Sequence, residues 1–180
     1  MIYMSGDSMV KYAKKVDNSS VKIIEYQKKY IKDVRDLLVA QEQEISSMDK
    51  DELDRVHPDY RIKYTSLELA DMRKNKGKCY LAIENDEVIG LILGIIHRYD
   101  KYDYLDYKCP RRGRVLEIIV NKKARRRGIG NMLMNQLENY FKSQNCEYII
   151  IEVLSYNETA KAFYNYNNYH ERTEVQIKKI

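Results

Sequence analysis

The second half of the chain alternates strand and helix patterns, and this alternation constrains the fold more than any other feature. The apolar runs "VLEIIVN" (residues 115–121) and "EYIIIEVL" (residues 147–154) predict two strands. Apolar side chains at helical spacing predict one helix over residues 128–144 and another over residues 157–168. Two strands joined through a helix of this length are expected to be parallel, with a right-handed crossover.

The first half of the chain adds antiparallel structure. "CYLAIEN" and "VIGLILGIIHRY" are separated by a short polar turn and predict a hairpin over residues 79–99. Residues 21–27 alternate as a strand does, and helical spacing predicts helices over residues 29–44 and 66–77. The acidic residues 46–60 have no clear period and indicate a loop or a short helical turn.

Together these patterns predict a single α/β (α+β) domain over residues 21–180. We expect a mixed central sheet of about six or seven strands, flanked by about four helices. Residues 169–180 should be mostly extended, and residues 1–20 should form a loosely ordered lead-in.

Composition narrows the class of protein. The 180 residues are 44% hydrophobic and 33% charged, with a formal net charge of +5, as in a soluble globular protein. The three cysteines are too scattered for a disulfide framework or a metal site, so we expect reduced thiols and no metal. No apolar run reaches the roughly 18 residues of a spanning helix, and no signal-peptide core is present. We therefore expect a cytoplasmic protein that does not bind membranes.

The turn "RRRGIG", from Arg125 to Gly130, lies between a predicted strand and a predicted helix. Glycines allow a tight turn and a helix start leaves N–H groups unpaired, which together suit a pyrophosphate. The turn lacks the features of a Walker-type loop and of the dinucleotide fingerprint. A nucleic-acid site would need interleaved aromatic residues or a second basic stripe, so no nucleic-acid partner is expected. On these residues alone, a solvated basic turn is the other interpretation.

The context of this turn resembles the acyl-CoA pyrophosphate motif of the GNAT superfamily of N-acetyltransferases. In that motif, Arg-x-x-Gly-x-Gly follows an apolar strand and opens a helix. The later segment "EYIIIEVLSYNETAKAFYNYNNY" resembles the next part of the family, with Asn157 beginning a helix that carries Tyr164. The family usually places glycine before an aromatic residue after this helix, where this chain has Asn168 and Tyr169. Asparagine tolerates the left-handed conformation that ends a helix, so the expected stop is retained.

The resemblance implies a GNAT-like fold from about residue 21 onward and acetyl-CoA as co-substrate. The strand backbone would pair with the pantetheine arm, the turn would hold the pyrophosphate, and Asn157 and Lys161 would lie along the cofactor. The residues implied are Ile118, Ile119 and Val120 in the strand, and Arg125, Arg126, Arg127, Gly128, Ile129, Gly130 and Asn131 in the turn.

Three residues are candidates for the chemistry of acetyl transfer. Tyr164 is placed by the resemblance as the acid for the leaving thiolate, since a phenol is protonated at neutral pH. Glu117 and Glu152 each interrupt an apolar strand, where a carboxylate must be paired or raised in pKa. Either carboxylate is a candidate general base, and a proton relayed through water is a third possibility.

The expected reaction is transfer of an acetyl group from acetyl-CoA to a primary amine of a small molecule or peptide. The amine would attack the thioester directly. Acids in residues 42–59, together with Asp100, Asp103 and Asp106, would suit a cationic acceptor if they flank its site. A solvated acidic surface explains them equally well, and a homodimer is left open. The alternatives are a non-catalytic acyl-CoA-binding regulatory module and a nucleic-acid-binding domain that uses the basic turn.

Overall fold

The computed structural model describes residues 19–180, so the predicted lead-in falls almost entirely outside the described residues. The strands are β1 (Lys22–Glu25), β2 (Lys78–Glu84), β3 (Glu87–Ile96), β4 (Arg112–Val120) and β5 (Tyr148–Ile150). The helices are α1 (Ile31–Met48), α2 (Tyr60–Lys74), α3 (Ile129–Ser143) and α4 (Glu158–Tyr166). The short 3-10 turns are η1 (Lys28–Tyr30), η2 (Asp103–Leu105) and η3 (Lys122–Ala124).

The strands form one mixed sheet in the order β1-β2-β3-β4-β5. The β2–β3 hairpin is antiparallel and β4 pairs with β5 in parallel, which confirms both predicted connections. The parallel pairing is brief, because it runs only from Arg112 opposite Tyr148 to Arg114 opposite Ile150. The sheet of the described residues therefore has five strands, slightly fewer than the six or seven expected, and residues 171–180 join no strand.

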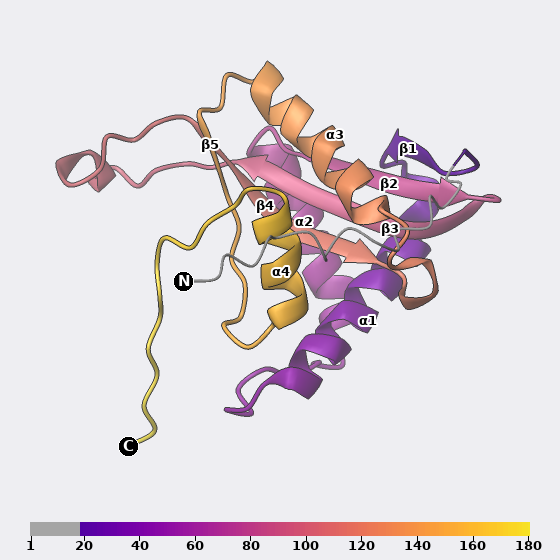
Figure 1. Ribbon diagram of the computed structural model, residues 1–180, viewed down its shortest axis with the longest axis horizontal. Coiled ribbons are helices and arrows are strands. Elements are labelled where there is room, and N and C mark those ends of the chain that lie inside the picture. Colours follow the sequence, from indigo (N-terminus) through magenta and orange to yellow (C-terminus); the bar gives the residue numbers. More distant parts are fainter. Residues whose placement is uncertain (1–18) are drawn as a thin grey trace, which may run out of the picture.

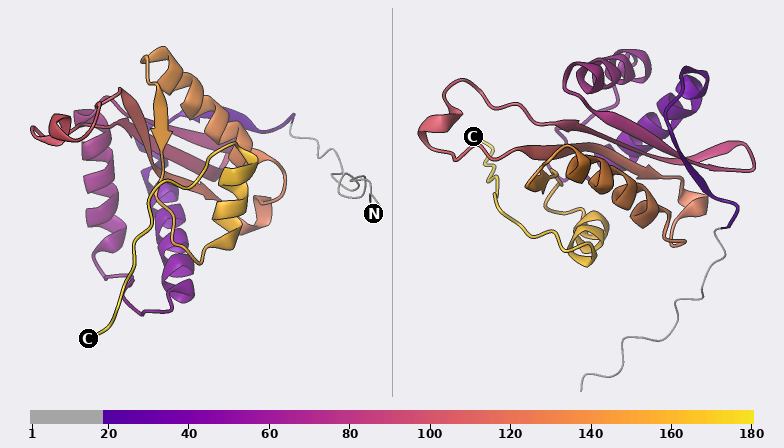
Figure 2. Two further views of the ribbon diagram at one scale, coloured as in Figure 1. Left: turned by 60° about the vertical axis from the view of Figure 1, so that its left-hand side comes forward. Right: turned by 90° about the horizontal axis from the view of Figure 1, so that it is seen from above.

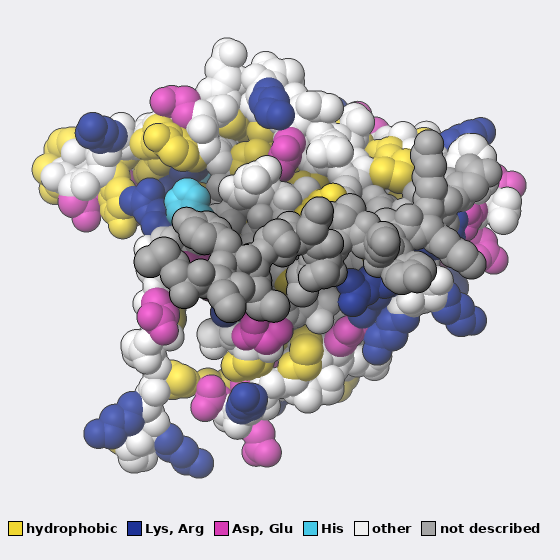
Figure 3. Space-filling model, in the orientation of Figure 1, with side chains coloured by type: hydrophobic (Ala, Val, Ile, Leu, Met, Phe, Trp, Pro, Cys, Tyr) yellow, Lys and Arg dark blue, Asp and Glu magenta, His cyan; other side chains and the backbone are white. Residues whose placement is uncertain are grey.

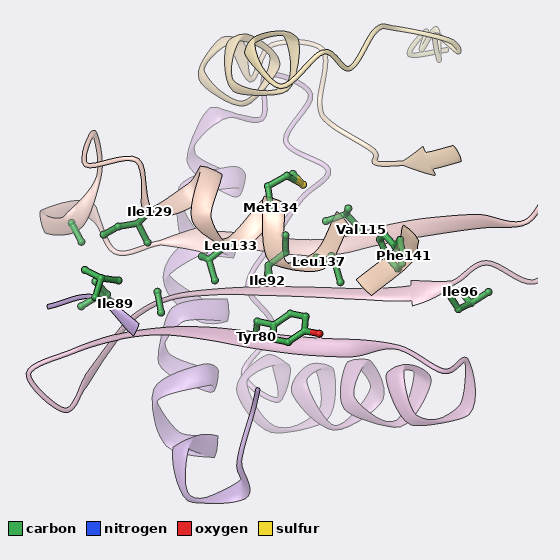
Figure 4. Close-up of a cluster of buried hydrophobic side chains, with 13 residues drawn as sticks. Tyr80, Ile89, Ile92, Ile96, Val115, Ile129, Leu133, Met134, Leu137 and Phe141 are labelled. Carbon is green, nitrogen blue, oxygen red and sulfur yellow. The ribbon is translucent and has the colours of Figure 1, made fainter. Parts of the chain in front are cut away.

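Helices cover both faces of this sheet (Figures 1 and 2). Helices α1 and α2 lie on one face, while α3 and α4 lie on the other. On the α3 face, Leu133, Leu137 and Phe141 are almost fully buried against the sheet, where they meet Ile92 (Figure 4). On the opposite face, Val34 is one of the α1 residues that pack on β2 and β3. The sheet thus separates two apolar layers.

The helix boundaries agree with the periodicity except around the acidic segment. Helix α1 continues to Met48 and α2 begins at Tyr60, so both extend into residues that were expected to form a loop or a turn. Helices α3 and α4 match the predicted spans closely. After α4, Asn168 has a φ of 64°, the left-handed conformation expected where the family has glycine.

The tyrosine-rich connector between β3 and β4 projects beyond the end of the sheet (Figure 1). Its tip exposes Tyr102, Tyr104 and Leu105. In the space-filling view, hydrophobic side chains on this projection lie among charged ones (Figure 3).

Candidate active site

A bulge in β4 determines which way Glu117 faces. Leu93 of β3 pairs with Glu117, but the next residue, Gly94, pairs with Val115, so one residue of β4 is inserted between them. Such an insertion reverses the alternation of side chains along a strand. Val115 therefore packs on the α3 face, whereas Glu117 faces α1 and α2.

Glu117 is a buried carboxylate held by two donors. Its residue is 6% exposed. The Tyr64 hydroxyl donates to its Oε1 over 2.5 Å, and the Gln41 amide donates to its Oε2 over 2.9 Å. Burial raises the pKa of Glu117 to about 7, and the negative charge of Glu68 adds to the effect, although both hydrogen bonds oppose it. A carboxyl group with this pKa exchanges a proton readily near neutral pH.

The α2 residues around Glu117 were not predicted from the sequence. Tyr60 and Tyr64 stack with ring centroids 4.5 Å apart, and the Tyr60 hydroxyl donates to Glu42 over 3.2 Å. These tyrosines were missed because the helix was expected to start at residue 66. The spacing of four between Tyr60, Tyr64 and Glu68, which is one face of a helix, was the available signal.

Glu152, the other candidate base, has a different environment. It lies just after β5, where its side chain is 81% exposed and accepts a hydrogen bond from Arg114 over 2.9 Å. Its carboxylate is therefore solvated and paired with a cation. The two acids that looked equivalent in the sequence differ strongly in burial.

Beyond Arg114, the edge of β4 that faces β5 has no partner strand among residues 19–180. Ile118, Ile119 and Val120 lie along this stretch and pair only with β3 on the other side. Ile119 is 5% exposed, while Ile118 and Val120 are partly buried against the α3 layer. A strand edge without a partner strand can bind an extended ligand that carries amides.

Tyr164, on α4, is the third candidate for the chemistry of acetyl transfer, after Glu117 and Glu152. Its ring contacts the rings of Phe163 and Tyr169, with centroids 5.5 and 6.1 Å away. Burial, together with the negative charge of Glu117, raises the pKa of Tyr164 to about 12. Tyr164 is therefore protonated at neutral pH and lies within electrostatic reach of Glu117.

The glycine-rich turn between β4 and α3 contains two left-handed residues, Arg126 with a φ of 65° and Gly128 with a φ of 81°. Such a turn directs successive backbone N–H groups toward one side, and the first amides of α3 have no acceptor within the helix. A Cβ atom added at Gly128 would meet nothing within 4 Å, so space is open there. At Gly130, an added Cβ would lie 3.1 Å from the Phe163 ring, so α3 and α4 approach closely. The turn fits an anion such as a pyrophosphate.

Two of the three arginines in this turn are bound to carboxylates. Arg125 donates to both oxygens of Glu44 in α1, over 2.8 and 2.7 Å, and to the Val120 carbonyl over 3.0 Å. Arg127 donates to both oxygens of Glu84 at the end of β2 and, by this contact, lowers the pKa of Glu84 to about 2. These arginines attach the turn to α1 and β2.

Asn157, Asn131 and Lys161, which the resemblance also implies for the cofactor site, make their contacts on or near α3 and α4. Asn157 accepts a hydrogen bond from the Ala160 amide and so caps α4. Asn131 accepts from Asn167 over 3.1 Å, which connects α3 to the end of α4. The Lys161 ammonium lies 3.4 Å from Glu171 and 3.7 Å from Glu158.

Three of the acids considered for acceptor binding have partners elsewhere in the protein. Glu42 and Glu44 bind Tyr60 and Arg125, as described above. Asp49 accepts hydrogen bonds from several backbone amides and from the Tyr156 hydroxyl, and the amide of Asp54 contributes most to holding the pKa of Asp49 at about 2. Asp100, Asp103 and Asp106 lie on the projecting connector.

Residues 19–180 contain no cluster of three or more His, Cys, Asp or Glu side chains suited to a metal ion. Within the same residues, none of the helices combines the length and apolarity needed to span a membrane.

Comparisons with known proteins agree with this arrangement. Residues 33–168 match the Acetyltransferase (GNAT) family. An uncharacterized N-acetyltransferase of Methanocaldococcus jannaschii is 32% identical over 130 residues, which cover 71% of this chain and 76% of that protein.

Two solved structures share the fold at low sequence identity. A mutant of the BH1408 protein of Bacillus halodurans is 14% identical with a TM-score of 0.78, covering 88% of this chain and 99% of its own. AAC(6')-Iy, solved in complex with the bisubstrate analog CoA-S-monomethyl-acetylneamine, is 14% identical with a TM-score of 0.63; the match covers 89% of this chain and 97% of that chain. From the family match and the relative above 30% identity, the chain belongs to the GNAT family of acetyltransferases and is an acyltransferase.

Proposed function

We propose that the protein transfers an acetyl group from acetyl-CoA to a primary amine by direct attack of the amine on the thioester. The observation that carries this proposal is Glu117. It is a buried carboxyl group with a pKa of about 7, held by Tyr64 and Gln41 beside the open edge of β4. A group of this kind is suited to remove a proton from an ammonium as the amine becomes a nucleophile.

The residues of this chain supply binding and proton transfer. Amides of the turn at Gly128 and Gly130 would hold the pyrophosphate, and the backbone from Ile118 to Val120 would hold the pantetheine arm. When bound, acetyl-CoA supplies an activated acetyl thioester. Arg125 is engaged with Glu44, so we assign it to positioning the turn.

The residues of this chain carry two of the proton transfers that accompany the exchange of bonds. Glu117 takes one proton from the acceptor ammonium, and the neutral amine then forms the carbon–nitrogen bond; the second proton that the nitrogen loses as the amide forms passes to water, from which Tyr164 later regains its own. Tyr164 gives its hydroxyl proton to the sulfur as the carbon–sulfur bond breaks, since the phenol remains protonated at neutral pH. We prefer Glu117 to Glu152 as the base because Glu152 is 81% exposed and paired with Arg114.

Two measurements test this function. Calorimetry should detect binding of acetyl-CoA, and release of CoA should be seen with at least one member of a panel of aminoglycosides, polyamines, amino acids and peptide N-termini. Binding without release across the panel would favour a non-catalytic acyl-CoA-binding module. No binding at millimolar acetyl-CoA would overturn the proposal entirely.

A further inference from the structure

Residues 171–180, the segment "ERTEVQIKKI", leave the body of the protein after α4 as an extended trace (Figure 1). All of these residues are exposed, and no backbone hydrogen bond joins any of them to another of residues 19–180. Glu171 lies 3.4 Å from the Lys161 ammonium, and the Arg172 guanidinium lies 6.0 Å from the centre of the Tyr107 ring. Residues 173–180 are held to residues 19–172 by no hydrogen bond, ion pair or ring contact.

The middle of this segment has the pattern of a β-strand. Thr173, Val175 and Ile177 alternate with polar residues, so in an extended chain they share one face. All three are β-branched, the shape that strands favour. Val175 is 88% exposed and Ile177 is 61% exposed. An extended segment with an apolar face and unpaired backbone groups is a template to which another strand can add.

The segment is complementary to a second copy of itself. Two copies can run antiparallel with Gln176 of one opposite Gln176 of the other. Glu174 of each copy then lies opposite Lys178 of the other, and Val175 lies opposite Ile177 in the same way. Two-fold symmetry repeats each match, so two pairs of opposite charge and two apolar pairs form. Side chains directly opposite across an antiparallel pair are close enough for both kinds of match to stabilise it.

Other arrangements of the two segments lack these matches. A parallel pairing in register would set Glu174 against Glu174 and Lys178 against Lys178, and like charges directly opposite each other are destabilising. A slip of one residue in the antiparallel pair would set Gln176 opposite Val175 or Ile177, so polar side chains would face apolar ones. The register centred on Gln176 is therefore favoured, and because it is two-fold symmetric it closes as a dimer instead of growing into a filament.

The sheet offers this ribbon of two strands further support. A two-stranded ribbon is marginally stable by itself, so its strands need another neighbour. β5 lies at the end of the sheet, and its outer edge has no partner strand among residues 19–180. Ile149 of β5 and Ile151 just after it pack against the apolar layer under α3. A strand added to this edge would continue that layer with Val175 and Ile177.

We propose that residues 173–179 of two copies of this chain pair as antiparallel strands centred on Gln176, and that this pairing joins the copies as a two-fold dimer. The partner is thus a second copy of the chain, recognised by its charge pattern and its apolar face. The proposal goes beyond acetyl transfer, because residues 173–179 touch none of the groups assigned to binding or proton transfer.

Reversal of the charges at residues 174 and 178 tests the pairing. Sedimentation equilibrium at micromolar to millimolar concentration should show the wild type as a dimer. Glu174→Lys or Lys178→Glu alone turns both charge matches into like-charge pairs and should raise the dimer dissociation constant at least about 10-fold. The double variant, Glu174→Lys with Lys178→Glu, restores opposite charges, so its dissociation constant should return to within about threefold of the wild type.

Lys179→Glu is the matched control, because it makes the same change of charge one residue further along. In the proposed register, residue 179 lies opposite Thr173, so the dissociation constant should stay close to that of the wild type. Deletion of residues 171–180 should give a monomer. The deleted residues lie in neither buried apolar cluster, so this variant should fold, which cooperative thermal unfolding checks.

Several results would overturn the proposal. A wild type that stays monomeric up to millimolar concentration would do so at once. A double variant that dimerises no more tightly than the single variants would exclude the register centred on Gln176. Equal weakening by Lys179→Glu and Lys178→Glu would show that net charge, and not register, controls association. A deletion variant that still forms the wild-type dimer would show that another surface joins the copies.

Discussion

The Tyr64 hydroxyl donates a hydrogen bond to Glu117 Oε1 across 2.5 Å, which joins the middle of α2 to the bulged strand β4. The bond stabilises the ionised carboxylate, while burial favours the protonated form. The balance leaves the pKa of Glu117 near 7, so both forms are populated at neutral pH. Small changes around this bond should therefore alter the proposed chemistry.

The first prediction concerns the dependence of kcat on pH. We expect kcat to rise with pH through about 7, as Glu117 loses its proton and becomes able to accept one from the amine. Glu117→Gln should lower kcat by about 100-fold or more and remove this rise. In Tyr64→Phe, which lacks the donor to the ionised form, the rise should move to higher pH.

Tyr60→Phe is the matched control, because Tyr60 stacks on Tyr64 but donates to Glu42. In Tyr60→Phe, kcat should rise with pH over the same range as in the wild type. A profile for Glu117→Gln that still rises near pH 7 would show that another group is the base.

The second prediction concerns stability. The pKa of Glu117 is raised in the folded protein, so its protonated form stabilises the fold below about pH 4.5, and this contribution is lost as pH rises through about 7. Relative to Glu117→Gln, the wild type should lose roughly 2 to 3 kcal/mol of unfolding free energy between pH 4.5 and pH 8. Urea unfolding of both proteins across this range measures it, and parallel curves would contradict the buried, shifted carboxyl group.

The third prediction concerns Tyr164. Tyr164→Phe should lower kcat by about 100-fold, because the departing sulfur loses its proton donor. The dissociation constant for acetyl-CoA, measured by calorimetry, should change little. Tyr166→Phe is the control on the same helix, since Tyr166 is 76% exposed. Unchanged turnover in Tyr164→Phe would exclude Tyr164 as the acid.

The fourth prediction concerns the glycine-rich turn. Gly128→Ala places a side chain on a residue with a φ of 81°, but in open space, so the cost is confined to the backbone, about 1 kcal/mol. We expect that loss in unfolding free energy together with weaker binding of acetyl-CoA, as the amides of the turn shift. Gly128→Asn should lose less unfolding free energy and less affinity for acetyl-CoA, because asparagine tolerates left-handed φ. Equal affinities in all three proteins would argue that these amides do not hold the cofactor.

Much of the fold follows from the sequence because its elements have clear periodicity. The parallel β4–β5 connection, the β2–β3 hairpin and helix α3 were all predicted from local patterns of apolar residues. The start of α2 was missed because Tyr60 follows an acidic stretch with no apolar period. The length of β5 was overestimated, because an apolar run cannot reveal where two strands separate.

Less of the site than of the fold could be predicted from the sequence, because the site depends on contacts between residues far apart in the chain. The bulge that turns Glu117 toward α2 arises from the register between β3 and β4, and no single residue in the sequence indicates it. Arg125 was expected near the pyrophosphate, yet its guanidinium binds Glu44, 81 residues earlier in the chain. The glycines, Glu117 and Tyr164 could be named from the sequence as candidate site residues, whereas the residues that contact them in the fold could not.

The brief pairing of β4 with β5 has a consequence for the behaviour of the protein between catalytic cycles. From Val115 to Val120, the outer edge of β4 presents backbone groups without a partner strand. Such an edge is a template on which another polypeptide can add a strand, and this is a common start of aggregation. If acetyl-CoA covers this edge, it also acts as a protective ligand. Aggregation on heating should then be slower in its presence, even when no acceptor amine is supplied.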